Sequence, residues 1–464
     1  MKTKAVIFLL IISIIFFIFS VGFAEFFILE PYSSSFFIPN TNRLIPPGKI
    51  IEPSPVVFTR LKTLSDIKND LILDEVDFIE ANLGEMKMRF YKSGEVLKEY
   101  SILTKGKEDS WSETPAGLFK IIKKHRIAYS ILGDVYMPFH MTFIGEYSIH
   151  GEPYEQDGTP LDRLFTSGCL NIKDEDAKEL FNLTEVGLPL LVLEDDFEND
   201  DFQYSIPETI SPDPEVSAES YLAADLKNNN IFLEKEADLL FPLDSITDLM
   251  TAIVASENSV LAFDKKKTTQ VHISENSLLP QGATPGIEID KTYTYFELLY
   301  PLLIASSNDA AESLALRFGR AKFVQMMNDR ASSIGMINTK FIDAYGGSEV
   351  NVSSAEELFY LARYLLNNRY WLLEISRGKV FENFGEISFK NLENTNPFND
   401  SADYIGGQVS EGTNGLKNSV LLFNFKINNE IRPIAIILLA SENVEKDTSE
   451  IINWIRLNFE HNNE

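Results

Sequence analysis

The chain has one cysteine, Cys169, and a histidine that could serve as its base, His150, lies upstream. A thiol attacks a carbonyl carbon as the thiolate, so it needs a lowered pKa and a nearby base. An imidazole can supply both. Gly168 suits a tight turn that lets a substrate approach the backbone closely, and backbone N–H groups at such a turn can hold a developing oxyanion. The amide of Asn171 could fix a substrate or orient the loop, so these residues together predict nucleophilic catalysis by a cysteine.

The N-terminal segment predicts that this thiol works outside the cytoplasm. Lys2 and Lys4 precede an apolar run from Ala5 to Ala24, which is the pattern of a secretory signal. About 20 apolar residues are also enough to cross a bilayer, so residues 1–24 are either a signal peptide or a membrane anchor. Exported cysteines usually pair in disulfides, and a lone one is either a buried passenger or a reactive group. The neighbouring histidine and glycine favour the reactive interpretation.

The composition excludes several classes of function. A net charge of −28 argues against nucleic-acid binding, which needs a basic face to neutralise phosphates. The same charge disfavours loose adhesion to anionic lipid and favours a soluble, self-repelling surface. The five histidines are dispersed and there is no second cysteine, so we predict no metal site and no cofactor. We assign His140 to the wall of a cleft or to the core.

Changes in composition divide the rest of the chain into segments. Residues 25–74 are mixed and contain prolines, and we predict a spacer there. Residues 75–194 show short strand-like alternation with a hairpin and a helix over 174–181, which predicts a mostly β domain. Residues 195–217 are acidic and contain prolines, which disfavours a packed core and predicts a linker. From 218 to 464, strands alternate with long helical stretches, which predicts an α+β domain.

The residues around Cys169 resemble those of a known enzyme family. L,D-transpeptidases of the YkuD type carry a histidine and then a Ser/Thr-His-Gly-Cys-hydrophobic-Asn/Arg block, which here becomes His150 followed by Thr166-Ser167-Gly168-Cys169-Leu170-Asn171. Ser167 departs from the family, which usually has histidine there, and we expect a changed rate or substrate preference from it. Further segments that resemble the family are Thr114-Pro115-Ala116-Gly117-Leu118-Phe119, Met137-Pro138-Phe139-His140-Met141 and Ser148-Ile149-His150-Gly151.

This resemblance implies chemistry on the stem peptides of peptidoglycan. Cys169 would attack the peptide carbonyl of the third residue, a diamino acid, in a tetrapeptide stem and release the terminal D-alanine, while His150 takes the thiol proton. The thioester would then pass to an amine of a neighbouring stem, giving a 3→3 cross-link, or to water, giving carboxypeptidase activity. The residues expected around the substrate and the oxyanion are Gly151, Thr166, Ser167, Gly168 and Asn171.

The C-terminal segment resembles a second family, the serine D-alanyl-D-alanine carboxypeptidases, which are low-molecular-mass penicillin-binding proteins. The family's Ser-x-x-Lys motif places a lysine one helical turn after the nucleophile, whereas here Asp248 follows Ser245. An aspartate with an ordinary pKa of about 4 is a poor base for a serine. We therefore predict a pseudo-enzyme domain with a degenerate site, made of Ser245, Asp248, Ser306, Asn308 and Lys417.

Together the resemblances imply a multi-domain chain of the bacterial envelope. A mostly β L,D-transpeptidase domain would be followed by an α+β domain of the three-layer α/β penicillin-binding protein type. The favoured function is an exported L,D-transpeptidase whose partners are peptidoglycan stem peptides. Two alternatives stay open, which are a non-catalytic wall-binding scaffold and a bifunctional enzyme in which Ser245 retains D,D-carboxypeptidase activity.

Overall fold

The computed structural model describes residues 59–459 except 131–132, 162–165, 195–199, 201, 206–209, 260–267, 279–286, 380, 382–388, 390–391 and 395. Within those ranges, no helix is both long and apolar enough to span a bilayer. Segment 1–24, where we predict the signal or anchor, lies outside the described residues.

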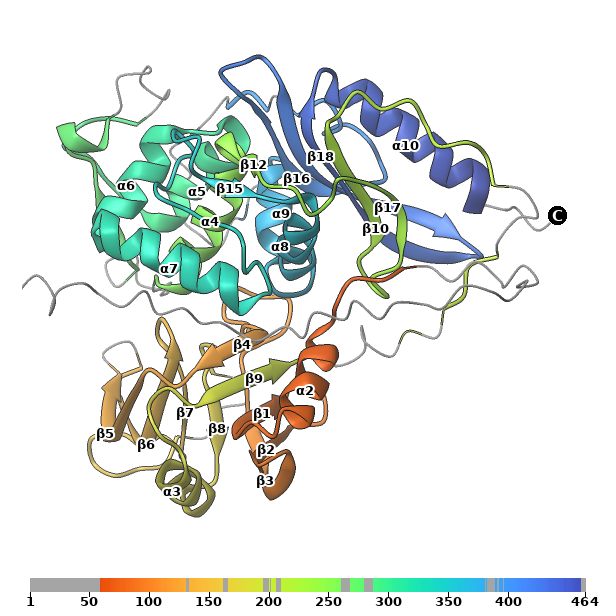
Figure 1. The fold of residues 1–464 in the computed structure, drawn as a ribbon. Helices are drawn as coiled ribbons and strands as arrows, with labels where there is room; N and C mark the ends of the chain where they lie inside the picture. The colour runs from red at the N-terminus through yellow and green to blue at the C-terminus, as the bar shows by residue number, and fades with distance from the viewer. Residues whose placement is uncertain are drawn as a thin grey trace, which may run out of the picture. The chain divides into compact units, whose positions relative to one another are not determined.

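The first domain is built on a nine-stranded sheet with the order β4-β9-β1-β2-β3-β8-β7-β6-β5 (Figure 1). Helix α3 (Asp174–Leu183) buries Ala177 and Leu180 in the core of this domain, where the sequence predicts a helix over 174–181. The nine-stranded sheet confirms the prediction of a mostly β domain. The strands are β1 (Phe78–Asn82), β2 (Lys87–Lys92), β3 (Glu95–Thr104), β4 (Gly117–Lys120), β5 (Lys123–Ser130), β6 (Val135–Ile144), β7 (Tyr147–His150), β8 (Leu170–Ile172) and β9 (Pro189–Leu193).

A helix occupies the end of the predicted spacer 25–74. Helix α2 (Leu64–Leu73) begins at a capping box, in which the Thr63 hydroxyl accepts from the Asp66 N–H and the Asp66 carboxylate accepts from the Thr63 N–H. Its buried Leu71 packs in one apolar cluster with Phe78 of β1. Residues 64–73 are therefore part of the packed structure, because their apolar face has a core to cover.

The second domain has three layers around a five-stranded sheet with the order β11-β10-β18-β17-β16 (Figure 1). Alternate residues of a strand point to opposite faces. On β18, Ile437 belongs to the core under α4 to α9, whereas Ile436 belongs to a second core with Trp454 of α10. Helices therefore cover both faces, which confirms the three-layer α/β prediction.

The bounds of its elements are as follows. The sheet contains β10 (Ser220–Asp225), β11 (Ile231–Lys235), β16 (Tyr404–Glu411), β17 (Lys417–Ile427) and β18 (Glu430–Ser441). The helices are η1 (Asp244–Ile246), α4 (Thr247–Glu257), η2 (Glu275–Ser277), α5 (Tyr295–Ala305), α6 (Asn308–Phe318), α7 (Arg320–Ser333), α8 (Ala355–Asn368), α9 (Tyr370–Ser376) and α10 (Val444–Phe459). Two short strand pairs complete it, β12 (Phe241–Pro242) with β15 (Val352–Ser353) and β13 (Gln270–His272) with β14 (Thr292–Thr294).

The described part of the predicted linker 195–217 packs against this second domain. Tyr204 is buried in the core beneath α10, and its hydroxyl donates to Asp225. The indole N–H of Trp454 donates to the carbonyls of Ser211 and Pro212 at 3.2 and 3.0 Å. Acidic and proline residues suggested a free tether, but the aromatic ring of Tyr204 supplies apolar surface to bury. These residues are therefore an extension of the second domain.

Candidate active site

Strand alternation places the predicted catalytic residues together. Strands β7 and β8 are parallel neighbours, with Ile149 opposite Leu170 and His150 opposite Asn171. Ile149 and Leu170 both lie in the core of the first domain. Because successive side chains alternate between the two faces of a sheet, the opposite face carries Ser148, His150, Cys169 and Asn171.

The sulfur of Cys169 contacts the turn between β6 and β7. Its Sγ lies 3.3 Å from the hydroxyl oxygen of Ser148 and donates to the carbonyl oxygen of Glu146 at 3.7 Å. Burial raises the pKa of the Cys169 thiol, and the hydrogen bond with Ser148 opposes this effect. The thiol is therefore protonated at neutral pH, and its activation requires a base.

His150 is arranged to be that base. Its ring is 3% exposed, and Nδ1 lies 2.7 Å from the carbonyl oxygen of Gly151. A carbonyl only accepts, so Nδ1 carries the hydrogen and Nε2 has the free lone pair. Burial lowers the pKa of His150 to about 4; the Gly151 carbonyl opposes this effect and His140 adds to it. The imidazole is thus neutral at pH 7.

Within the described residues, no hydrogen bond joins the Cys169 thiol to His150 directly. Catalytic hydrogen bonds are often long without substrate and tighten when it binds. Transfer of the thiol proton requires the sulfur to exchange its contacts with Ser148 and Glu146 for one with Nε2.

Two threonines fasten the turn that carries the nucleophile. Thr166 donates to the Cys169 carbonyl at 2.5 Å and accepts from the Gly168 N–H at 3.1 Å. Thr114 donates to the Gly168 carbonyl at 2.9 Å. The Gly168 N–H, which we expected in the oxyanion site, is therefore engaged by Thr166, and the Cys169 N–H is the better candidate. Ser167 is exposed at the tip of this turn.

The remaining predicted residues border the same face. Asn171 is buried, and its Oδ1 has no hydrogen-bond partner among the described residues. Gly151 has no room for a side chain, because a Cβ there would clash with the carboxylate of Asp174. The ring of His140 lies 6.1 Å from that of His150, centroid to centroid, and burial lowers the pKa of His140 to about 4. His140 is thus a buried neighbour of His150.

Three residues at the site, Ser148, Glu146 and Thr114, are not among those predicted from the sequence. Ser148 had a signal, because it precedes His150 by two positions on one strand and must share its face. The Glu146 carbonyl and the Thr114 hydroxyl had none, since each reaches the nucleophile turn from a distant part of the sequence.

In the second domain, Asp248 is fully buried and does not supply the cationic group of the family's lysine. Neither of its carboxyl oxygens has a hydrogen-bond partner among the described residues, Ser245 included. Burial raises the pKa of Asp248 well above its usual range, and the carboxylate of Asp343 adds to the effect. The expectation of an ordinary aspartate pKa is therefore wrong: burial favours the neutral carboxyl, which makes no hydrogen bond to Ser245.

The other residues of the degenerate site lie in η1, which contains Ser245, and at the ends of α5, α6 and β17. Ser306 has a left-handed backbone with φ of 46°, and its hydroxyl accepts from Gln408 of β16 at 2.7 Å. The Lys417 ammonium lies 3.2 Å from the carboxylate of Glu411. Asn418, the residue after Lys417, donates to the Asp244 carboxylate at 3.1 Å. Asn308 begins α6, next to Ser306.

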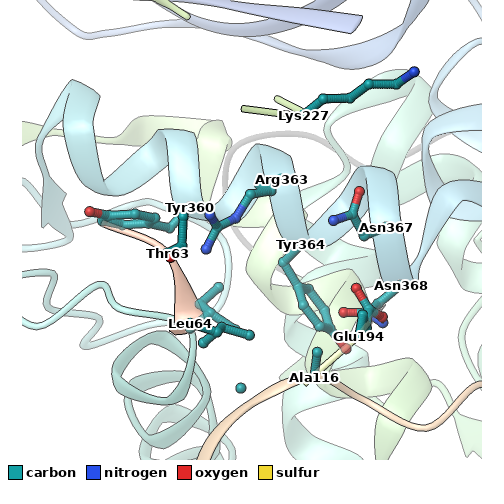
Figure 2. Close-up of a pocket in the computed structure, with 12 residues that line it drawn as sticks. Thr63, Leu64, Ala116, Glu194, Lys227, Tyr360, Arg363, Tyr364, Asn367 and Asn368 are labelled. Carbon is teal, nitrogen blue, oxygen red and sulfur yellow. The ribbon is translucent and has the colours of Figure 1, made fainter. Parts of the chain in front are cut away.

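A separate cavity lies at the boundary of the two domains (Figure 2). Its lining includes Ala116 and Glu194 of the first domain and Arg363 and Asn368 of α8. The Asn368 amide donates to the Glu194 carboxyl, and burial raises the pKa of Glu194 to about 7. Cys169 is not among the lining residues, so this cavity is distinct from the thiol's surroundings.

Comparisons with known proteins match two families. Residues 207–438 match the model of D-alanyl-D-alanine carboxypeptidase (peptidase S11), and residues 77–192 match that of the L,D-transpeptidase catalytic domain (YkuD). A D-alanyl-D-alanine endopeptidase of Escherichia coli is 34% identical over 152 residues, which are 32% of this chain and 48% of that one. Its counterpart in Haemophilus influenzae is 33% identical over 157 residues, 32% of this chain and 51% of that one. The chain thus spans about half the length of the curated relatives it matches.

A solved structure of a D-alanyl-D-alanine carboxypeptidase from Mycobacterium tuberculosis covers 54% of this chain and 95% of its own, at 21% identity and a TM-score of 0.46. The first family model covers half of the chain, from residue 207 to residue 438. The chain therefore belongs to the D-alanyl-D-alanine carboxypeptidase family through its C-terminal half and carries an L,D-transpeptidase catalytic domain before it.

Proposed function

We propose that the protein is an exported L,D-transpeptidase or L,D-carboxypeptidase of peptidoglycan that works through a thioester on Cys169. One observation carries this proposal. The Cys169 thiol and the His150 imidazole share one face of two adjacent strands, and the Gly151 carbonyl fixes the tautomer in which Nε2 is basic. The match to the L,D-transpeptidase catalytic domain supplies the substrate class.

The proposed reaction uses the thiol and the imidazole in two steps. Nε2 of His150 accepts the thiol proton as the sulfur bonds to the carbonyl carbon of the third stem residue, and the Cys169 N–H stabilises the oxyanion. The C–N bond to D-alanine then breaks, and His150 returns the proton to the leaving amine. An amine of a second stem, or water, then bonds to the thioester carbonyl carbon as the C–S bond breaks, and His150 carries the proton of the attacking group to the sulfur, which restores the thiol.

The second domain is proposed to be a pseudo-enzyme. The family's lysine is replaced by Asp248, whose buried carboxyl has a raised pKa and no hydrogen bond to the Ser245 hydroxyl. A serine without an adjacent base is a weak nucleophile. The domain would therefore keep the fold of a D,D-peptidase without forming an acyl-enzyme.

Turnover of a disaccharide-tetrapeptide by the full chain tests the proposal. The parent should release D-alanine or form a cross-linked dimer, as read by mass spectrometry, and Cys169→Ala should do neither because the attacking sulfur is gone. Ser245→Ala is the matched control in the second domain and should retain full activity. Retention of substrate on a column by an inactive parent would instead favour the wall-binding scaffold.

Labelling with two β-lactams separates the two sites in the same preparation. A carbapenem should form an adduct at Cys169, and a labelled penicillin should not acylate Ser245. Acylation of Ser245 would support the bifunctional alternative and contradict the pseudo-enzyme.

The pH dependence of turnover tests the state of the base. Because the pKa of His150 is lowered to about 4, the imidazole accepts a proton over the whole range above that pH. We expect kcat/KM for D-alanine release to be retained at pH 5 and to fall as the pH drops through about 4, with circular dichroism confirming the fold at each point. An acid limb near the ordinary histidine pKa of about 6.5 would contradict a buried, neutral imidazole.

A further inference from the structure

A buried ionic cluster lies at the C-terminal end of α4. The carboxylate of Glu257 accepts from Arg330 and from Arg369, each at 3.0 Å, and from the hydroxyl of Tyr364. The side chains of Glu257, Arg330 and Arg369 are each 1% exposed. Buried charges are costly unless they are paired and hydrogen-bonded, so these contacts fix the two guanidinium groups in place.

Both arginines extend from this cluster to the first domain. Arg369 Nη2 lies 3.4 Å from the hydroxyl of Tyr147 in β7, and its Nη1 donates to the Glu113 carbonyl at 3.4 Å. The guanidinium of Arg330 lies 5.3 Å from the ring centroid of Phe119 in β4. Asn368, the residue before Arg369, also contacts the first domain through its hydrogen bond to Glu194, and both residues are labelled in Figure 2. The second domain therefore holds the β7 end of the first.

Tyr147 connects this cluster to the nucleophile. Its ring lies directly against Gly168, so close that a Cβ on that glycine would clash with it. The residues on either side of Tyr147 both touch the sulfur of Cys169, Ser148 through its hydroxyl at 3.3 Å and Glu146 through its carbonyl at 3.7 Å. Three consecutive residues thus define where the thiol lies, and the middle one is held from the other domain.

We propose that Arg369 is a positioning residue for the thiol of Cys169 and acts through Tyr147. The second domain, which lacks its own acylation chemistry in our proposal, would then set the geometry of the cysteine site. This inference rests on the proposed function of Cys169 as a nucleophile. It explains why a guanidinium group is buried at the boundary when an apolar residue could fill the same space.

Two variants of the full chain test the proposal. Tyr147→Phe keeps the ring under Gly168 and removes only the hydroxyl near Arg369. Arg369→Met keeps that hydroxyl and removes the guanidinium group with its positive charge. We expect kcat for D-alanine release to fall about tenfold in the first and about a hundredfold in the second, with KM unchanged, because 1 Å of misplacement can cost about 10² in rate. The control is Arg456→Met, which removes an arginine that is 42% exposed and pairs with Asp403.

Alkylation of Cys169 by iodoacetamide gives a readout that needs no turnover. If the turn is released, the thiol becomes less buried, so the pH midpoint of alkylation should shift down toward the ordinary thiol value in both variants. A loss of stability alone would lower the melting temperature without moving this midpoint in the folded protein. Parent-like kcat and parent-like alkylation in both variants would overturn the proposal. An inactive parent whose alkylation midpoint still shifts in the variants would overturn the proposed function and leave the positioning role intact.

Discussion

A His150→Gln variant is expected to lose roughly 10²–10⁴-fold in kcat for D-alanine release, which is the usual contribution of a positioned general base. The glutamine amide can still donate to the Gly151 carbonyl, as Nδ1 does at 2.7 Å, so the local backbone should hold its position. What disappears is the basic nitrogen Nε2. Because the thiol pKa is raised by burial, little thiolate forms without that base. Steady-state kinetics with a tetrapeptide substrate measures the loss.

The matched control is His140→Gln. The two histidine rings lie 6.1 Å apart between centroids, and burial lowers the pKa of each to about 4, so the same substitution perturbs a similar environment. In contrast to His150, His140 makes no hydrogen bond from Nδ1 within the described residues. Its replacement should change kcat less than about tenfold. An equal loss in both variants would contradict the assignment of His150 as the base.

The sequence was sufficient to pair His150 with Cys169 because both residues lie in short motifs on neighbouring strands. Once β7 and β8 are adjacent, strand alternation puts their polar residues on one face. The same rule could have added Ser148, which shares a strand with His150. The contact between Tyr147 and Arg369 could not have been predicted, since the two residues are 222 positions apart and no local pattern links them.

Local patterns also misled the assignment of segment boundaries. The proline-bearing composition of residues 25–74 obscured the capping box of Thr63 and Asp66, which starts α2. In the predicted linker, charge and proline obscured Tyr204, whose ring is buried in the core beneath α10. Both errors arise because the composition of a segment does not show whether a neighbouring domain offers an apolar surface on which that segment can pack.

Asp248 shows the difference between a residue's type and its environment. The sequence identifies the loss of the family's lysine, and it suggests an ionised, weakly basic carboxylate. The structure buries that carboxyl completely and gives neither oxygen a hydrogen-bond partner among the described residues. Burial, which no sequence pattern quantifies, therefore changes the expected protonation state from charged to neutral.

An Asp248→Asn variant should gain stability relative to the parent as the pH rises. Burial raises the pKa of Asp248 in the folded chain, while the unfolded chain keeps a pKa near the ordinary aspartate value of 3.8. Between these two values the unfolded state releases a proton that the folded state retains, so rising pH favours unfolding of the parent. The asparagine does not titrate. The difference in free energy of unfolding should therefore grow by up to about 1.4 kcal/mol per pH unit from about pH 4 to the folded pKa.

Urea denaturation at several pH values measures this difference, and Asp66→Asn provides a control of opposite sign. Partial burial tends to raise the pKa of Asp66, but hydrogen bonds from Arg60 and Thr63 outweigh it and lower the pKa in the folded chain. The parent therefore gains stability over this variant as the pH rises. A difference for Asp248→Asn that does not change with pH would mean that the carboxyl is ionised when folded. That outcome would contradict the raised pKa of the buried Asp248 carboxyl.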